Sequence, residues 1–228
     1  MQFSKINAII VSLYHKKNYY LLSLFHSKGI INTIVYNSII KKFKSNINTL
    51  VKANFEIVKE NNLYKIIEVN DEEFILKDLN YEKLIIINLW SKLINLSFDD
   101  GECFELFTKA TDVLNNSTME KTFLVDLQYK IRFLIIKNFL CLSNICFTCD
   151  KQIENNYYYD MQTNGFNCIN CASNKNHYLN KESFKYLKDT TQKSISSSLL
   201  IDLTSKSKAL IEVMIKNKIN TEFEKTLI

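Results

Sequence analysis

Four of the six cysteines stand in two short pairs, and their spacing is the strongest chemical signal in the sequence. Cys146 and Cys149 form one C-x-x-C pair, and Cys168 and Cys171 form a second pair after eighteen intervening residues. A C-x-x-C turn places two thiolates one ligand edge apart, and two such turns complete a tetrahedral site for Zn²⁺. We therefore predict one structural zinc ion held by all four cysteines, with no position left open for a catalytic water.

Other chemistry is compatible with paired cysteines. Two disulfides would suit an oxidising compartment, whereas the rest of the sequence predicts a cytoplasmic protein. A redox dithiol rarely comes as a spaced pair. His177 could replace one ligand, although we expect a surface histidine there. Cys103 and Cys141 fall on apolar helical stripes, so we expect both to be buried thiols.

The sequence lacks the common catalytic patterns. It contains no G-x-S-x-G, no phosphate-binding glycine loop and no H-E-x-x-H. The three histidines are isolated, and the carboxylate pair Asp99-Asp100 beside Gly101 is more typical of a helix cap. We do not expect an enzyme.

Positive charge is concentrated at the N-terminal end. The net charge is +5, but the first 55 residues carry eight lysines and no acid, which leaves −3 for the remainder. This asymmetry predicts a surface for a polyanion, although a solvated basic face gives the same pattern. The candidate phosphate contacts are Lys16, Lys17, Lys28, Lys41, Lys42 and Lys44.

The composition is that of a folded protein with unusual turns. Hydrophobic residues make up 46% and charged residues 23% of the 228 positions, and there are three glycines and no proline. Asparagine tolerates left-handed backbone and is the expected substitute in turns. No run approaches the ~20 apolar residues of a membrane span, and no cleavage site follows the apolar run at 6–14. We therefore expect a cytoplasmic protein with no membrane contact.

Two kinds of periodicity follow one another along the chain. Apolar, β-rich segments without a helical period occupy 6–14, 19–25, 30–36, about 50–57 and 63–69, which predicts an OB-like barrel or an SH3-like half-barrel. Apolar residues at helical spacing follow at 71–96 and 101–114. Ser117 and Glu120 form a capping-box pattern that predicts the start of a third helix, and a last helix is predicted at 205–224. The spacer between the cysteine pairs predicts a hairpin turning at Asn164-Gly165, and 194–198 a loop.

We therefore expect an α+β protein in two domains. Residues 1–75 would form a basic five-stranded OB-like barrel, and residues 76–228 a helical domain with a four-cysteine zinc insertion at about 142–178.

This order of parts resembles the bacterial recombination mediators of the RecO family. Residues 21–29 look like the family's second strand and glycine turn, and 38–45 stand in place of its basic loop. Arg132 with 133–135, followed by the first cysteine pair, resembles the helix that leads into the family's zinc site. The chain departs from the family pattern where glycines are usual, at Ser38, Asn138, Asp150 and Ala172, and it has lysines in place of loop arginines.

The resemblance implies a non-enzymatic, nucleoid-associated protein of recombinational repair. Such a protein binds single- and double-stranded DNA, anneals strands and, with RecR, helps to load RecA on strands coated by single-strand binding protein. RecR and the acidic C-terminal tail of single-strand binding protein would be its protein partners. Arg132 and Lys137 are candidate cations for that tail.

The residues also support DNA binding without the resemblance. Aromatic residues interleave with the N-terminal lysines, a combination that suits sequence-independent strand binding, although each aromatic could instead belong to the barrel core. They are Tyr14, Tyr19, Tyr20, Phe25, Tyr36 and Phe43. The alternatives are a zinc-ribbon accessory module of ribosome or polymerase whose barrel binds RNA, and a protein-interaction scaffold.

Overall fold

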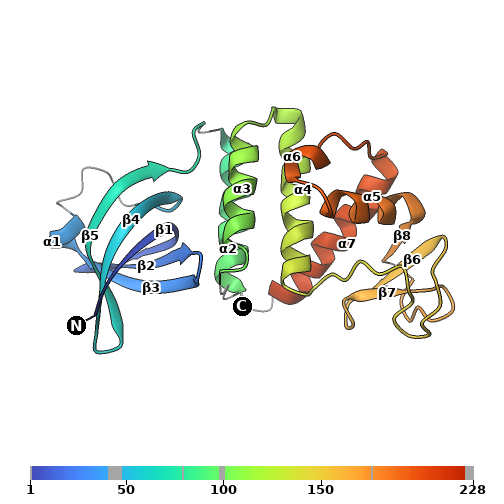
Figure 1. The fold of residues 1–228 in the computed structure, drawn as a ribbon, viewed down its shortest axis with the longest axis horizontal. Coiled ribbons are helices and arrows are strands. Elements are labelled where there is room, and N and C mark those ends of the chain that lie inside the picture. Colours follow the sequence, from blue (N-terminus) through green and yellow to red (C-terminus); the bar gives the residue numbers. More distant parts are fainter. Residues whose placement is uncertain (1, 41–47, 79, 98–100, 176, 224–228) are drawn as a thin grey trace. The chain divides into compact units, whose positions relative to one another are not determined.

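The computed structural model describes residues 2–40, 48–78, 80–97, 101–175 and 177–223 (Figure 1). Within these residues the chain is α+β, as predicted, with a five-stranded sheet, a smaller three-stranded sheet and seven helices. The chain divides into two compact units, Met1–Asn115 and Asn116–Ile228, and each is described by itself.

The first unit is built on a closed barrel of five strands. The barrel order is β1-β2-β3-β5-β4, and β4 pairs back onto β1. Neighbouring strands are antiparallel except β3 and β5, which pair in parallel through Thr33–Tyr64 and Ile34–Lys65. The elements are β1 (Gln2–His15), β2 (Tyr19–His26), β3 (Gly29–Tyr36), the short helix α1 (Asn37–Ile40), β4 (Val51–Glu60) and β5 (Leu63–Phe74).

Alternating side chains fill the barrel. Ala8 and Ile10 of β1 join Leu22, Leu24 and Phe55 in one buried cluster, as expected when every second residue of a strand faces inward. The outward residues of the same strand are also buried: Ile9 is 1% exposed. This explains why β1 reads as a continuous apolar run rather than as a strand with one polar face.

Two helices cover that outer face of the barrel. They are α2 (Tyr81–Leu96) and α3 (Phe104–Asn115). Asn95 of α2 donates to the carbonyl of Val11 at 3.1 Å, and Phe25 contacts the rings of Phe104 and Phe107 at 5.3 and 6.0 Å. These helices therefore belong to the first unit, whereas the sequence pattern grouped them with the later helices.

The start of the first long helix differs from the prediction. Residues 71–74 continue β5, where Glu73 pairs with Lys52 of β4, and the helix begins at Tyr81 after the N-cap residue Asn80. The Asn80 side chain accepts from the backbone N–H groups of Glu82 and Lys83. Residues 71–80 therefore precede the helix that the sequence pattern predicted to begin at residue 71.

The second unit combines helices with a small sheet of strand order β7-β6-β8. Its aromatic core joins the two parts, because Tyr157 of the sheet stacks on Phe184 of α5 at 3.8 Å. The elements are α4 (Met119–Ile136), β6 (Asn156–Asp160), β7 (Gly165–Asn167), β8 (Tyr178–Asn180), α5 (Lys181–Thr191), α6 (Ile195–Ser198) and α7 (Ser205–Phe223).

Two local predictions in this unit are wrong. The N-cap residue of α4 is Thr118, which makes no side-chain cap hydrogen bond, and not Ser117 as the predicted capping box requires. The serine-rich segment predicted as a loop contains the short helix α6, because the Ser194 side chain accepts from the Ser197 N–H.

Asparagine replaces glycine in turns, as the composition predicted. Asn61, Asn62, Asn138 and Asn164 all have φ between 49° and 63°. The hairpin predicted between the cysteine pairs is present as β6 and β7, and Asn164 immediately precedes β7. No helix among the described residues combines the length and apolar character needed to cross a bilayer.

Candidate metal centre and basic surface

The four cysteines lie on two backbone turns that the β6–β7 hairpin brings together. Cys146 and Cys149 belong to a turn in which the Asp150 N–H donates to the Cys146 carbonyl at 3.0 Å. Cys168 and Cys171 follow β7 directly, and the Ala172 N–H donates to the Cys168 carbonyl at 3.0 Å. The Phe147 N–H donates to Phe166 of β7 at 3.0 Å, which holds the first turn beside the second.

The four Sγ atoms form one cluster of metal-binding size. All lie within 4.8 Å of one another, and Cys149 and Cys168 are 3.9 Å apart. A tetrahedral ion with metal–sulfur bonds of about 2.3 Å separates its ligands by roughly 3.8 Å. A disulfide needs about 2.05 Å, and all six cysteines are free thiols. The donor set therefore fits a tetrahedral metal ion, held by the four predicted cysteines.

The electrostatics of the cluster favour a cation. Burial alone would raise the pKa of the Cys146 thiol, but the backbone N–H groups of Cys168, Cys149 and Thr148 outweigh it and lower the pKa to about 6. Hydrogen bonding with the thiols of Cys149 and Cys168 raises the pKa of Cys171 to about 12. The Cys146 thiol thus ionises more readily than the Cys171 thiol. Four thiolates this close would repel one another unless a metal ion lay among them.

Two residues that the sequence analysis missed support the cluster. Asn167 is 3% exposed, and its Oδ1 lies 3.5 Å from the Cys146 Sγ and 3.0 Å from the Thr148 hydroxyl. Polar groups around metal ligands orient them and tune the site. The only sequence signal is position, since Asn167 precedes Cys168 and Thr148 lies inside the first C-x-x-C pair.

The backbone at Asp150 adopts a conformation that usually favours glycine. It follows the first cysteine pair with φ = 58°, in the left-handed region that favours glycine. Aspartate is among the few other residue types that enter this region readily. The turn therefore keeps its backbone conformation without glycine.

The six predicted phosphate contacts do not all lie in one place. Lys16 and Lys17 are exposed in the β1–β2 turn. Lys28 lies in the β2–β3 turn, at the other end of the eight-residue strand β2, which is about 26 Å at ~3.3 Å per residue. Lys41, Lys42 and Lys44 lie outside the described residues.

Aromatic side chains surround the β1–β2 turn. Tyr14 is 64% exposed and Tyr36 41% exposed. The Tyr19 and Tyr36 rings meet edge to face at 6.4 Å, and His15 stacks on Tyr20 at 4.4 Å. We call this surface the basic-aromatic end of the barrel; its members are Tyr14, His15, Lys16, Lys17, Tyr19, Tyr20 and Tyr36.

The other aromatic candidates do not join that surface. Phe25 is fully buried against the helices, so it belongs to the core. Phe43 lies outside the described residues.

Other candidate residues have structural positions. Cys103 is buried as predicted, but Cys141 is exposed because it lies after the end of α4 and not on a helix. His177 lies outside the cysteine cluster, with its Nδ1 3.3 Å from the Asn217 side chain. The Arg132 guanidinium donates to the carbonyls of Thr190 and Lys193, so it caps the end of α5.

A comparison of the sequence with known protein families finds no matching family model, and a comparison with curated proteins finds no matching relative.

Proposed function

We propose that this protein is a non-enzymatic, nucleic-acid-binding protein of recombinational repair, with a role like that of the RecO mediators. It would bind single- and double-stranded DNA, anneal complementary strands and, with RecR, assist the loading of RecA on strands coated by single-strand binding protein. The observation that carries the nucleic-acid part of the proposal is the basic-aromatic end of the barrel.

The position of that surface supports the proposal. We interpret the barrel as OB-like, a fold that binds oligonucleotides on the face of its second and third strands. Tyr19 begins β2 and Tyr36 ends β3, and the two residues are cross-strand partners. Lys16 and Lys17 stand beside them, and β1 to β3 contain no carboxylate. Exposed rings for base stacking and ammonium groups for phosphates are the two parts of a single-strand site.

The helix α1, which precedes the remaining candidate lysines in the sequence, begins at the same surface. The Asn37 N–H of α1 donates to the Asn18 carbonyl at 3.3 Å, and its side chain lies 3.4 Å from the Lys17 carbonyl. Lys41, Lys42 and Lys44 follow α1 in the sequence and lie outside the described residues.

We also propose that the metal is Zn²⁺, one ion per chain with a structural role. An all-cysteine, tetrahedral donor set is the usual structural zinc site. Four protein ligands leave no position for water, which agrees with a protein that carries no catalysis.

Salt-dependent binding separates the two parts of the DNA site. Each single-strand phosphate neutralised adds about 0.7 to the log–log salt slope. The Lys16→Ala/Lys17→Ala variant should therefore lower the slope for single-stranded DNA by about 1.4, and the triple alanine variant of Lys41, Lys42 and Lys44 by about 2. Tyr14→Ala should weaken binding about tenfold or more with an unchanged slope, because stacking releases no counterions. Fluorescence anisotropy at several salt concentrations measures both quantities.

The control is Lys109→Ala, since Lys109 is an exposed lysine of the same unit, paired with Glu105 on α3. Unchanged affinity and slope in both lysine variants would show that the strand binds elsewhere. Tighter binding of structured RNA than of single-stranded DNA would favour the accessory-module alternative. The mediator role requires annealing of strands coated by single-strand binding protein without ATP, and failure of that assay would refute it.

A further inference from the structure

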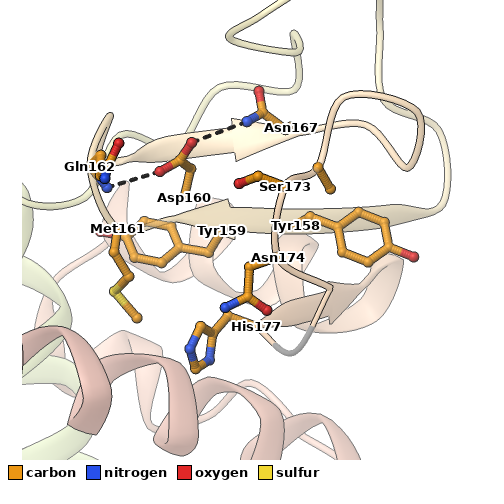
Figure 2. A pocket seen from close by; sticks show the side chains of 10 residues that line it. Tyr158, Tyr159, Asp160, Met161, Gln162, Asn167, Ser173, Asn174 and His177 are labelled. Atoms are coloured by element: carbon orange, nitrogen blue, oxygen red, sulfur yellow. Dashed lines mark hydrogen bonds between the residues drawn. The ribbon is translucent and has the colours of Figure 1, made fainter.

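A cavity lies beside the cysteine cluster, on one face of the β6–β7 hairpin. Its volume is about 380 Å³. Tyr158 and Asp160 are two residues apart on β6, and Asn167 pairs directly opposite Tyr158, so all three share this face. Figure 2 shows Ser173 and Asn174 on the loop across from them and His177 at the far side.

The walls of the cavity are continuous with the metal-binding turns. Asn167, on the hairpin side, lies within 3.5 Å of the Cys146 Sγ. The opposite wall is formed by Ala172, Ser173 and Asn174, which follow Cys171 directly. The four cysteines therefore fix the separation of the two walls, and a metal ion bound among them would hold the cavity in shape.

The charge on the cavity lining is negative. Among the described residues that line the cavity, Asp160 is the one carboxylate and none is a lysine or arginine. The carboxylate accepts from the backbone N–H of Gln162 at 2.8 Å and from the Asn167 side chain at 3.4 Å (Figure 2). These two donors and the Thr163 N–H, which donates to the carboxylate at 3.5 Å, are neutral, and within the described part of the chain Asp160 forms no ion pair. Four thiolates around a divalent ion would add further negative charge nearby.

The lining also offers apolar surface next to that charge. The Tyr158 ring and the Met161 thioether both line the cavity. Lysine and arginine side chains combine an apolar stem with a cationic head, so they match a carboxylate beside aromatic and thioether groups. Phosphate and carboxylate groups would meet the Asp160 carboxylate, with no lysine or arginine among the described lining residues to attract them.

We propose that this cavity binds the cationic head of an arginine or lysine side chain from a partner polypeptide, with Asp160 as its counter-ion. This would make the cysteine-bearing module a protein-docking site. The inference does not depend on DNA binding by the barrel, because it uses only residues of the second unit.

The proposal can be tested with a small cationic probe and its neutral isostere. N-acetyl-arginine N-methylamide is titrated into the full-length, zinc-loaded protein, and the side-chain amide resonances of Asn167 and Asn174 are followed by NMR. We expect saturable shifts with the arginine probe and at least tenfold weaker binding of the citrulline analogue, which replaces the guanidinium by a neutral urea. This comparison needs no variant.

Two matched variants locate the site. Asp160→Asn removes the charge but keeps an oxygen that can accept from Gln162, so the turn is retained, and the arginine probe should bind at least tenfold more weakly. Asp150→Asn removes one carboxylate from the same module outside the lining and keeps a residue type that tolerates positive φ; binding should stay within about twofold.

Three results would overturn the proposal. They are equal binding of the citrulline analogue, equal losses in the two variants, or stronger shifts of the same resonances by adenosine monophosphate than by the arginine probe. The last result would show a nucleotide site instead.

Discussion

At the scale of single residues, the buried histidine His26 is expected to affect stability in a way that its sequence context does not indicate. His26 is 7% exposed, at the end of β2. Its Nδ1 accepts from the Lys28 N–H at 3.2 Å, and its buried Nε2 has no hydrogen-bond partner among the described residues. Burial, with a smaller contribution from the charge of Lys28, lowers the pKa of His26 below its ordinary value of 6.5.

This burial predicts a pH-dependent stability of the first unit. Because the pKa of His26 is lower in the folded than in the unfolded protein, its contribution to the unfolding free energy is complete above about pH 6.5. That contribution declines as the pH falls toward the pKa of His26 in the folded protein. His26→Asn keeps an oxygen for the Lys28 N–H and should flatten the dependence of the unfolding free energy between pH 7 and pH 5. Urea unfolding followed by the fluorescence of Trp90, the single tryptophan, measures it.

The matched control for this prediction is His15→Asn, since His15 is an exposed histidine on the same barrel. It should retain the wild-type pH dependence. Equal flattening in both variants, or none in His26→Asn, would contradict the role assigned to burial of His26.

At the scale of elements, a buried lysine ties three segments of the second unit together. The Lys218 side chain of α7 is 2% exposed, and its Nζ donates to the Met161 carbonyl at 2.9 Å and to Asn164 and Glu222 at 2.5 Å. Asn164 in turn donates to the carbonyl of Asn138 at the end of α4. The β6–β7 turn is therefore fixed by α7 on one side and by α4 on the other.

We expect Lys218→Met to destabilise the second unit by about 1.5–3 kcal/mol, because it leaves the acceptors of the turn without a charged donor. Lys216→Met changes an exposed lysine of the same helix and should cost less than about 0.5 kcal/mol. Native-state hydrogen exchange of the β6–β7 amides measures both changes. Similar protection in the two variants would contradict the role of Lys218.

At the scale of the whole molecule, the charge asymmetry of the sequence does not coincide with the division into units. The first unit has 14 lysines against 13 acidic residues, and the second has 15 basic against 11 acidic residues. The acids of β5, α2 and α3 join the basic strands in one unit. A polyanion surface must therefore be local, as the basic-aromatic end is, and not a property of one whole unit.

Because the four cysteines all lie in the second unit, we expect loss of the metal to change the stability of the two units unequally. Elemental analysis of protein purified without chelator should find one zinc per chain. Removing it, or replacing Cys149 by serine, should lower the unfolding free energy of the second unit by several kcal/mol, because binding energy of a structural ion contributes to folding. The transition reported by Trp90 in the first unit should change little.

The serine variant needs a control that removes a thiol without removing a ligand, and Cys141→Ser provides it, because Cys141 is exposed and outside the cluster. Zinc content well below one per chain, or equal destabilisation of both units, would refute this account.

The sequence was sufficient to predict the strands and the metal ligands, because both depend on local signals. Apolar, β-rich segments without a helical period predicted five strands, and the C-x-x-C spacing predicted four sulfurs that do meet. The packing of α2 and α3 on the barrel, the Arg132 cap and the buried Lys218 depend on contacts between residues far apart in the chain. No spacing within one segment encodes such contacts.

The left-handed residues bear on how relatives of this chain can be found. Asn138 and Asp150, where the proposed resemblance to RecO proteins would place glycine, both have φ = 58°. A comparison that scores residue identity counts two mismatches there, although the backbone follows the course that glycine would permit. Asparagine and aspartate at positive φ can therefore preserve the backbone of a turn where glycine is absent from the sequence. Distant relatives should therefore be sought by aligning positive-φ positions, with asparagine, aspartate and glycine treated as one class.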